Sequence, residues 1–116
     1  MTKLYLMHWT EYEAGWGSRP DGYTIYPSAD DARQHIKNFL NEKQSYECFS
    51  KPSWSECKAI EMKTPVDFNG AHVLWLSNKD LNGEKWKRME NGKEIVVEEV
   101  KPKYEYLVYP NETVAI

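Results

Sequence analysis

Three Asn-Gly pairs divide the second half of the chain, at residues 69–70, 82–83 and 91–92. Asn-Gly accepts the positive φ angles of two-residue hairpin turns, so each pair predicts a reversal between antiparallel strands. The segments between the pairs have strand-like lengths and mix apolar with charged residues. We expect a β-meander with strands at residues 72–76, 85–89, 94–100 and 104–109. A short helix within residues 78–89 is the alternative, although Gly83 disfavours a long one.

Residues 29–43 have the clearest helical pattern. Ser28 is a favourable N-cap, and Asp30 and Asp31 would lie in the first turn, where negative charge complements the helix dipole. The apolar residues of the segment recur at helical spacing and form one stripe: Ala32, Ile36, Phe39 and Leu40. The pattern predicts an amphipathic helix that packs through this stripe.

Two short strands are expected before this helix. Residues 4–10 alternate so that Leu4 and Leu6 face one way and Met7 and Trp9 the other, as in a strand with two apolar faces. Residues 23–26 form a second apolar segment. The intervening residues 11–22 are rich in glycine and aromatics, and residues 19–22 fit a type I turn. We expect a hairpin with a long, structured loop.

These elements define an α+β fold. The expected order is β-β-α followed by an antiparallel β-meander, with one central helix at about residues 29–43 and a further strand at residues 58–63. The 116 residues fit a single domain spanning residues 1–116.

Composition disfavours several functional classes. The chain has 15 basic and 18 acidic residues and a net charge of −3, whereas nucleic-acid binding depends on accumulated positive charge. No apolar run approaches the length of a membrane-spanning helix, so we expect no membrane association. Only Cys48 and Cys57 are present, which favours a cytoplasmic protein with reduced thiols. A bridge between these two cysteines is the alternative.

Charges of both signs alternate from Lys79 to Glu105, with seven basic and seven acidic residues. We interpret this run as the solvent-exposed face of the meander. Glu98, Glu99, Lys101 and Lys103 would also discourage an edge strand from pairing with another chain.

The sequence shows no recognisable catalytic or metal-binding pattern. The residues that could serve as soft metal ligands lack the short pairs typical of zinc sites; they are His8, His35, His72, Cys48 and Cys57. Neither cysteine lies in a known nucleophile signature. We therefore predict no catalytic residue, no metal and no cofactor.

The segment around residues 12–23 is the expected ligand-binding surface. The chain has 16 aromatic residues, more than a core of this size needs. Glycines allow a ligand to approach the backbone, arginine can bind a phosphate or carboxylate, and aromatic rings can stack on a base. The predicted binding residues are Trp9, Tyr12, Trp16, Arg19, Asp21 and Tyr23. In the alternative interpretation, Arg19 pairs with acidic residues of its own loop.

From Tyr12 to Tyr23, and on to the helix start at Ser28, the chain resembles small bacteriophage accessory proteins. The resemblance implies a counter-defence factor in the host cytoplasm. We expect a non-enzymatic, homo-oligomeric binding protein that sequesters a small anionic, nucleotide-like ligand. One alternative is a protein–protein inhibitor that blocks a host defence protein. Another is an enzyme without a recognisable motif.

Overall fold

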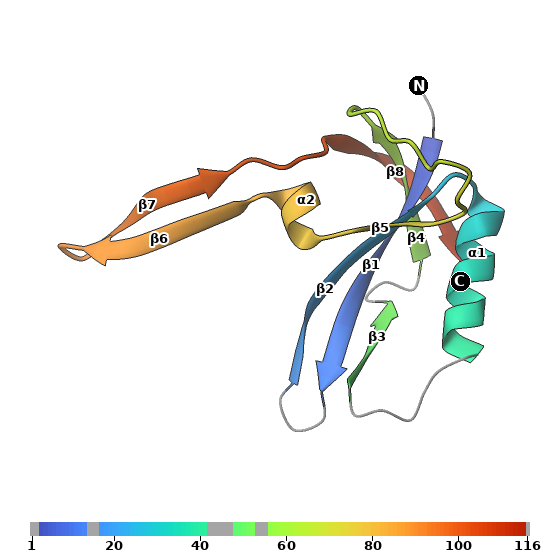
Figure 1. Cartoon of the computed structure of the whole chain (residues 1–116), viewed down its shortest axis with the longest axis horizontal. Coiled ribbons are helices and arrows are strands. Elements are labelled where there is room, and N and C mark those ends of the chain that lie inside the picture. Colours follow the sequence, from blue (N-terminus) through green and yellow to red (C-terminus); the bar gives the residue numbers. More distant parts are fainter. Residues whose placement is uncertain (1–2, 14–16, 42–47, 53–55, 116) are drawn as a thin grey trace.

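The computed structural model describes residues 3–13, 17–41, 48–52 and 56–115. Strands dominate, as the sequence predicts, and two helices interrupt them (Figure 1). The elements in chain order are β1 (Lys3–Glu13), β2 (Gly17–Tyr26), α1 (Ala29–Asn41), β3 (Cys48–Pro52), β4 (Glu56–Met62), β5 (Leu74–Leu76), α2 (Asn78–Asn82), β6 (Glu84–Glu90), β7 (Lys93–Val100) and β8 (Tyr106–Ala115).

The α+β class and the β-β-α order are confirmed, and every strand pair among the described residues is antiparallel. The main sheet has the order β5-β2-β1-β4-β8, and β3 also pairs with β1. The later strands therefore pair over long distances: β5 joins β2 at one edge, and β8 joins β4 at the other. Among the described strands that follow α1, only β6 and β7 pair as neighbours in sequence, and they form a separate two-stranded sheet.

The expected long loop at residues 11–22 is wrong. Most of this segment extends β1 and β2, with Thr10 opposite Pro20 and Glu13 opposite Gly17. Instead of closing a type I turn, Asp21 is the extra residue where the register shifts, a β-bulge. Because β5 pairs only with residues 23–25 of β2, Pro20 lies on a free stretch of the strand, where its missing N–H costs no sheet hydrogen bond.

Helix α1 begins where the sequence predicts. The Ser28 hydroxyl accepts a hydrogen bond from the backbone N–H of Asp31 at 3.1 Å, and it donates to the Asp31 carboxylate at 2.8 Å. Ala32 and Ile36 are fully buried, and Phe39 is half-buried. These three members of the predicted stripe thus pack against the sheet, whereas the side chain of Leu40 lies outside the described residues, and the described helix ends at Asn41.

The main sheet buries apolar side chains on both faces. Along β1, Leu4 and Leu6 enter one cluster, while Met7 and Trp9 enter another beneath α1, as the alternation predicts. The first cluster is covered by α2 and by parts of residues 62–68 and 104–106. β1 is therefore a central strand with no solvent-facing side over residues 4–7.

The three Asn-Gly pairs have three different roles. Asn91-Gly92 forms the expected hairpin turn between β6 and β7, with φ angles of 50° and 75°. Asn82-Gly83 instead ends the short helix α2, which confirms the helical alternative for residues 78–82. Asn69-Gly70 turns a segment that contains no strand.

The β6–β7 hairpin projects from the rest of the molecule (Figure 1). We call this hairpin, residues 84–100, the arm. The molecule measures 52 × 41 × 28 Å, and its radius of gyration is 16.5 Å, against about 13 Å for a compact domain of this length. Within the described residues, no helix combines the length and apolar character needed to cross a membrane.

Candidate functional site

The predicted ligand-binding residues do not share one described surface. Trp9 is fully buried beneath α1, whereas Tyr23 is 8% exposed in the cluster on the opposite face of the sheet. The Tyr23 hydroxyl accepts a hydrogen bond from the Asn82 side-chain amide at 3.0 Å, and its ring lies 4.8 Å from that of His8. Asp21 is exposed at the bulge. Trp9 and Tyr23 therefore contribute to the core from opposite sides.

The remaining predicted residues are only partly placed. Tyr12 pairs with Ser18 across β1 and β2, and Arg19 lies opposite Glu11. The side chains of Tyr12 and Arg19, and the whole of Trp16, lie outside the described residues. A binding surface made by these three side chains stays a prediction.

A chain of hydrogen bonds runs from Trp9 to the surface. The Trp9 indole donates to the Thr24 hydroxyl, the hydroxyls of Thr24 and Tyr26 are joined, and the Tyr26 hydroxyl is joined to Nδ1 of His35, each at 2.7 Å. Since indole N–H can only donate, every proton finds an acceptor if Thr24 donates to Tyr26 and Tyr26 donates to His35. That direction makes His35 a neutral imidazole protonated on Nε2.

Burial favours the uncharged form of both titratable side chains in this series of hydrogen bonds. It lowers the pKa of His35 below its ordinary value of 6.5 and raises the pKa of Tyr26. Both side chains are therefore uncharged near neutral pH. His35 also lies on a hollow of about 350 Å³, lined by Asp31, Gln34, His35, Asn38, His72 and Val73. Asp31 contacts exposed His72 at 2.9 Å, so two of the polar side chains that line the hollow are already paired with each other.

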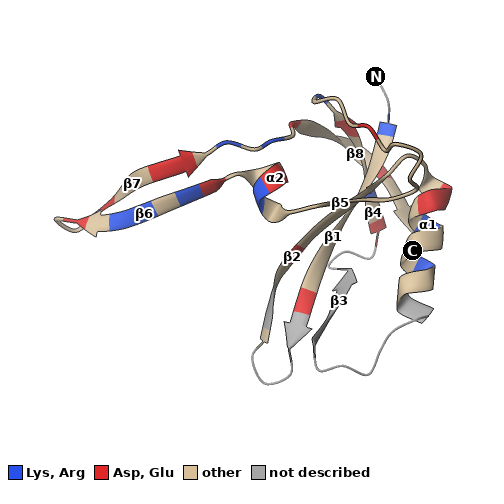
Figure 2. Cartoon of the chain, viewed as in Figure 1, with Lys and Arg blue, Asp and Glu red and all other residues tan. Residues whose placement is uncertain are grey.

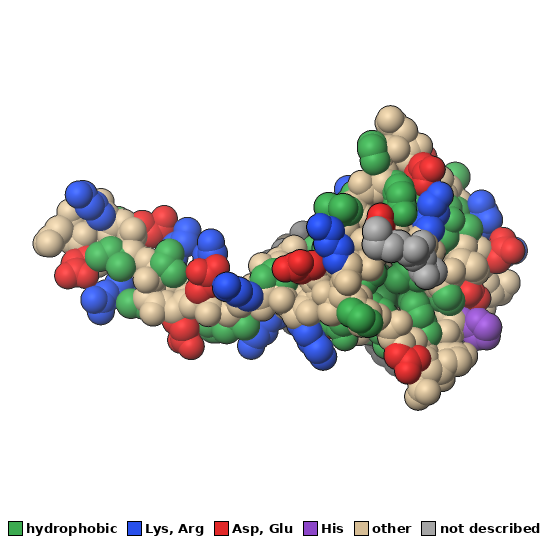
Figure 3. Space-filling view, turned by 90° about the horizontal axis from the view of Figure 1, so that it is seen from above, with side chains coloured by type: hydrophobic (Ala, Val, Ile, Leu, Met, Phe, Trp, Pro, Cys, Tyr) green, Lys and Arg blue, Asp and Glu red, His purple; other side chains and the backbone are tan. Residues whose placement is uncertain are grey.

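The arm is the most unusual exposed feature. Every residue of β6 is exposed, and so is every residue of β7 except Val100. The exposed set includes five large apolar side chains whose exposed fractions range from 37% to 70%: Trp86, Met89, Ile95, Val96 and Val97. Figure 3 shows apolar side chains lying between the charged ones along the arm. Isolated two-stranded hairpins are marginally stable in water, so such an arm gains from further contacts.

Charges of both signs alternate along the arm (Figure 2). Lys85 and Glu99 lie 3.9 Å apart across the strands, and Lys87 and Glu94 lie 3.5 Å apart. Arg88 contacts Glu90 on its own strand at 3.2 Å. These pairs are exposed, and each contributes at most about 1 kcal/mol. They leave the large apolar side chains of the arm exposed.

The root of the arm is fixed to the body. Ser77 and Asp80 form a reciprocal capping box at the start of α2, and Leu81 is buried. The backbone N–H of Tyr104 donates to the carbonyl of Asp80 at 3.0 Å. At Gly83, a Cβ atom would clash with the carbonyl oxygen of Val100, so the backbone segments that enter and leave the arm lie close together.

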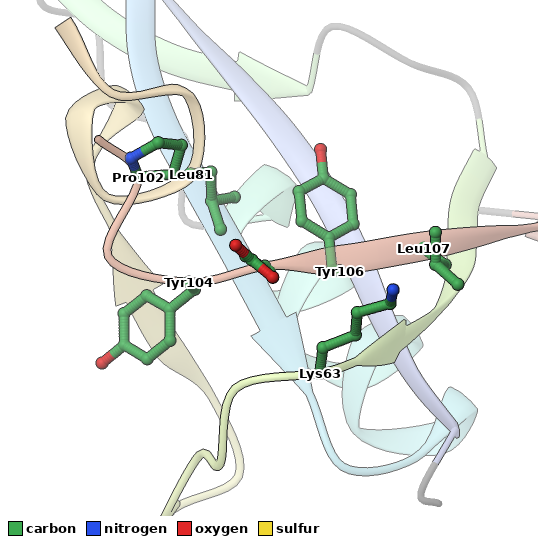
Figure 4. A pocket seen from close by; sticks show the side chains of 7 residues that line it. Lys63, Leu81, Pro102, Tyr104, Tyr106 and Leu107 are labelled. Carbon is green, nitrogen blue, oxygen red and sulfur yellow. The ribbon is translucent and has the colours of Figure 1, made fainter. Parts of the chain in front are cut away.

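A hollow of about 290 Å³ lies beside this root (Figure 4). It is surrounded by Leu81 of α2, by Lys63 and by the segment that leads into β8. Tyr104 and Tyr106 point in different directions around it. Its lining residues are Lys63, Leu81, Pro102, Tyr104, Glu105, Tyr106 and Leu107. The hollow adds apolar surface close to the arm.

Reactive groups are sparse in the described part of the chain. Cys57 is a free, buried thiol whose pKa burial raises to about 12. Such a thiol is a poor nucleophile. No group of three or more His, Cys, Asp or Glu side chains suited to a metal ion occurs among the described residues.

Comparisons with protein-family models, with curated proteins and with solved structures give no significant match. The site is therefore interpreted from its own geometry.

Sequence reasoning missed the arm as a site. The alternating charges from Lys79 to Glu105 predict one face of a meander, but residues 84–100 of this run form a hairpin that is exposed on both faces. The available signal was Asn91-Gly92 between two charged segments that also contain Trp86, Met89 and Ile95–Val97. Periodicity alone cannot show that such a hairpin leaves the main sheet.

Proposed function

We propose that this is a non-enzymatic binding protein that docks onto a polypeptide partner through the β6–β7 arm. One observation carries the proposal: a hairpin that projects from the body exposes Trp86, Met89 and three aliphatic side chains. A concentration of large apolar side chains exposed to water is typical of interaction surfaces. This agrees with the expectation of a protein-binding factor better than with a pocket for a small ligand.

The residue types of the arm support a protein partner. Aromatic residues, Met and Arg are enriched in protein interfaces, and Trp86, Arg88 and Met89 lie within four positions of one another. The free edges of a two-stranded sheet also offer unpaired backbone groups, which another strand can complete. Apolar side chains and an open edge act together because a pairing strand would cover both.

The small-ligand function expected from the sequence stays a separate prediction. It depends on the side chains of Tyr12, Trp16 and Arg19, which lie outside the described residues, and the bacteriophage resemblance depends on the same segment. The described members, Trp9 and Tyr23, are buried. The arm therefore gives the better supported binding surface.

Site-specific photocrosslinking tests the proposal. A benzophenone amino acid replaces Met89, which is 70% exposed on the arm, in cells that produce the full chain. The matched control places the same group at Lys37, which is exposed on α1, and α1 lies on the far side of the body from the arm (Figure 1). We expect a crosslinked product of defined mass from position 89 and none from position 37. The absence of any position-89 product above the control would overturn the proposal.

A further inference from the structure

We propose that the polypeptide bound by the arm is a second copy of this chain, paired antiparallel along β6 about a twofold axis at Trp86. The inference rests on the proposed function, since it names the partner of the same surface. Pairing would turn two isolated hairpins into one four-stranded sheet in the order β7-β6-β6-β7. Three or more strands are the usual requirement for a sheet that is stable by itself.

The free edges of β6 and β7 differ in how regularly another strand could pair with them. Opposite Trp86 and Lys87, β7 contains Glu98 and Val96, so Val97 is an extra residue and β7 carries a bulge. Bulges bend an edge and interrupt its hydrogen bonding. β6 keeps an unbroken run from Glu84 to Glu90. The straight β6 edge is therefore the one suited to another strand.

The turn determines which backbone groups are available on this edge. Glu90 and Lys93 flank a two-residue turn and pair with each other. The two residues of such a flanking pair point their backbone N–H and C=O groups at each other. Along the strand, the backbone groups of successive residues point alternately to the partner strand and to the free edge. The N–H and C=O groups of Lys85, Lys87 and Met89 therefore point to the free edge. In the proposed dimer, Lys85 of one copy exchanges backbone hydrogen bonds with Lys87 of the other.

Twofold symmetry restricts the register. Rotation about an axis perpendicular to the sheet keeps each side chain on its own face, and directly opposed residues of an antiparallel pair also share a face. The axis must therefore lie midway between the two copies of one residue, so that this residue is opposite itself. An axis at Lys87 would place Lys87 against its copy and Glu84 against Glu90. An axis at Arg88 would place Arg88 against its copy. Both registers bring like charges together, and neither sets any opposite charges against each other in return.

The axis at Trp86 gives complementary neighbours. It places the two Trp86 rings side by side and sets Glu84 opposite Arg88 twice. These pairs are the non-hydrogen-bonded ones, in which side chains lie closest. Lys85 faces Lys87 on the other side of the sheet, but each lysine already has a glutamate partner, Glu99 or Glu94. Only this register combines aromatic contact with two opposite-charge pairs.

A charge-swap experiment on the full chain tests this register. Sedimentation velocity over a concentration series should show a species of twice the 13.7 kDa chain mass for the unmodified protein. Glu84→Arg and Arg88→Glu should each raise the dimer dissociation constant at least tenfold, because each creates two like-charge contacts. The double variant E84R/R88E should return it to within about threefold of the original, and an equimolar mixture of the two single variants should form a heterodimer. Glu98→Arg on β7 is the matched control and should leave the dimer intact.

The outcomes separate this inference from the proposed function. A chain that is monomeric at every concentration, but whose position 89 crosslinks to a different protein, overturns self-pairing and leaves arm-mediated binding standing. A dimer whose dissociation constant does not change in the charge-swap variants overturns the Trp86 register. A monomer without any position-89 crosslink overturns both.

Discussion

The indole N–H of Trp9 donates a 2.7 Å hydrogen bond to the hydroxyl of Thr24, and both residues are fully buried. Trp9 lies on β1 and Thr24 on β2, so this bond links the two central strands beneath α1. The same hydroxyl contacts that of Tyr26. Thr24 thus allows a large aromatic side chain with a polar group to be buried at no cost in unsatisfied hydrogen bonds.

Thr24→Val should destabilise the protein by about 1–3 kcal/mol. Valine has nearly the same shape as threonine but cannot accept the Trp9 proton, and a buried donor without a partner costs about that much. Urea unfolding monitored by tryptophan fluorescence measures the change. Tyr26→Phe should also destabilise the protein by about 1–3 kcal/mol, because it leaves the buried Thr24 hydroxyl without its acceptor. If Thr24→Val unfolds at the same urea concentration as the original chain, the hydrogen bond has no net role.

Gly22→Ala should destabilise the protein by about 2–3 kcal/mol. Gly22 has a φ of +140°, and a Cβ atom there would lie 2.7 Å from the carbonyl oxygen of Leu76. Gly70→Ala is the matched control, since Gly70 has a φ of +81° with nothing within 4 Å of an added Cβ. We expect it to cost only about 1 kcal/mol, from backbone strain. Equal losses for the two variants would contradict the close β2–β5 approach.

Stability should decrease as the pH falls below about 6.5. Burial lowers the pKa of folded His35, so the unfolded chain binds a proton at a higher pH than the folded one does. This stabilising contribution is complete above pH 6.5 and is lost as the pH falls towards the pKa of folded His35. Burial lowers the pKa of His8 as well, with the same sign.

His35→Gln isolates the contribution of His35. The difference in unfolding free energy between the original chain and the variant should change between pH 6.5 and 5. Uptake of one full proton would give a slope of roughly 1.4 kcal/mol per pH unit. We expect a smaller slope, because His35 is only partly buried. Identical pH profiles for the two proteins would show that His35 does not titrate differently on folding.

Cys57 should resist alkylation in the folded protein. Its pKa is about 12 against an ordinary 9.0, so the thiolate fraction at pH 8 falls about a thousandfold, and burial adds a steric barrier. The measurement is the iodoacetamide labelling rate of a Cys48→Ser variant with and without denaturant. Labelling should become fast only when the chain unfolds. Rapid labelling of the folded variant would place Cys57 outside the core.

Local signals in the sequence predicted the elements better than their pairing. The cap at Ser28 and the alternation of residues 4–7 depend on neighbours in sequence, and both are observed. The bulge at Asp21 was missed because a Pro-Asp-Gly segment fits a turn equally well, and local sequence does not show that Gly22 lies against Leu76, 54 positions later. Asn82-Gly83 likewise ends a helix because the capping box of Ser77 and Asp80 precedes it.

The candidate site was less predictable than the fold for a similar reason. Aromatic residues indicate burial or binding equally, and Trp9 and Tyr23 are buried because α1 and α2 cover the two faces of the sheet. The exposure of Trp86 and Met89 depends on the arm leaving the sheet. Neither outcome can be read from residue type.

Removing the arm should leave the body folded. The change replaces residues 85–99 with Asn-Gly, so that Glu84 and Val100, which already pair, flank a two-residue turn. The deleted residues are all exposed, so the unfolding free energy of the body should change by no more than about 0.5 kcal/mol. Leu81→Ala at the buried root is the contrasting variant, with an expected loss of about 2–5 kcal/mol. Circular dichroism during urea unfolding measures both, and loss of cooperative unfolding in the arm-deleted chain would show that the arm stabilises the body instead of serving as a separate binding element.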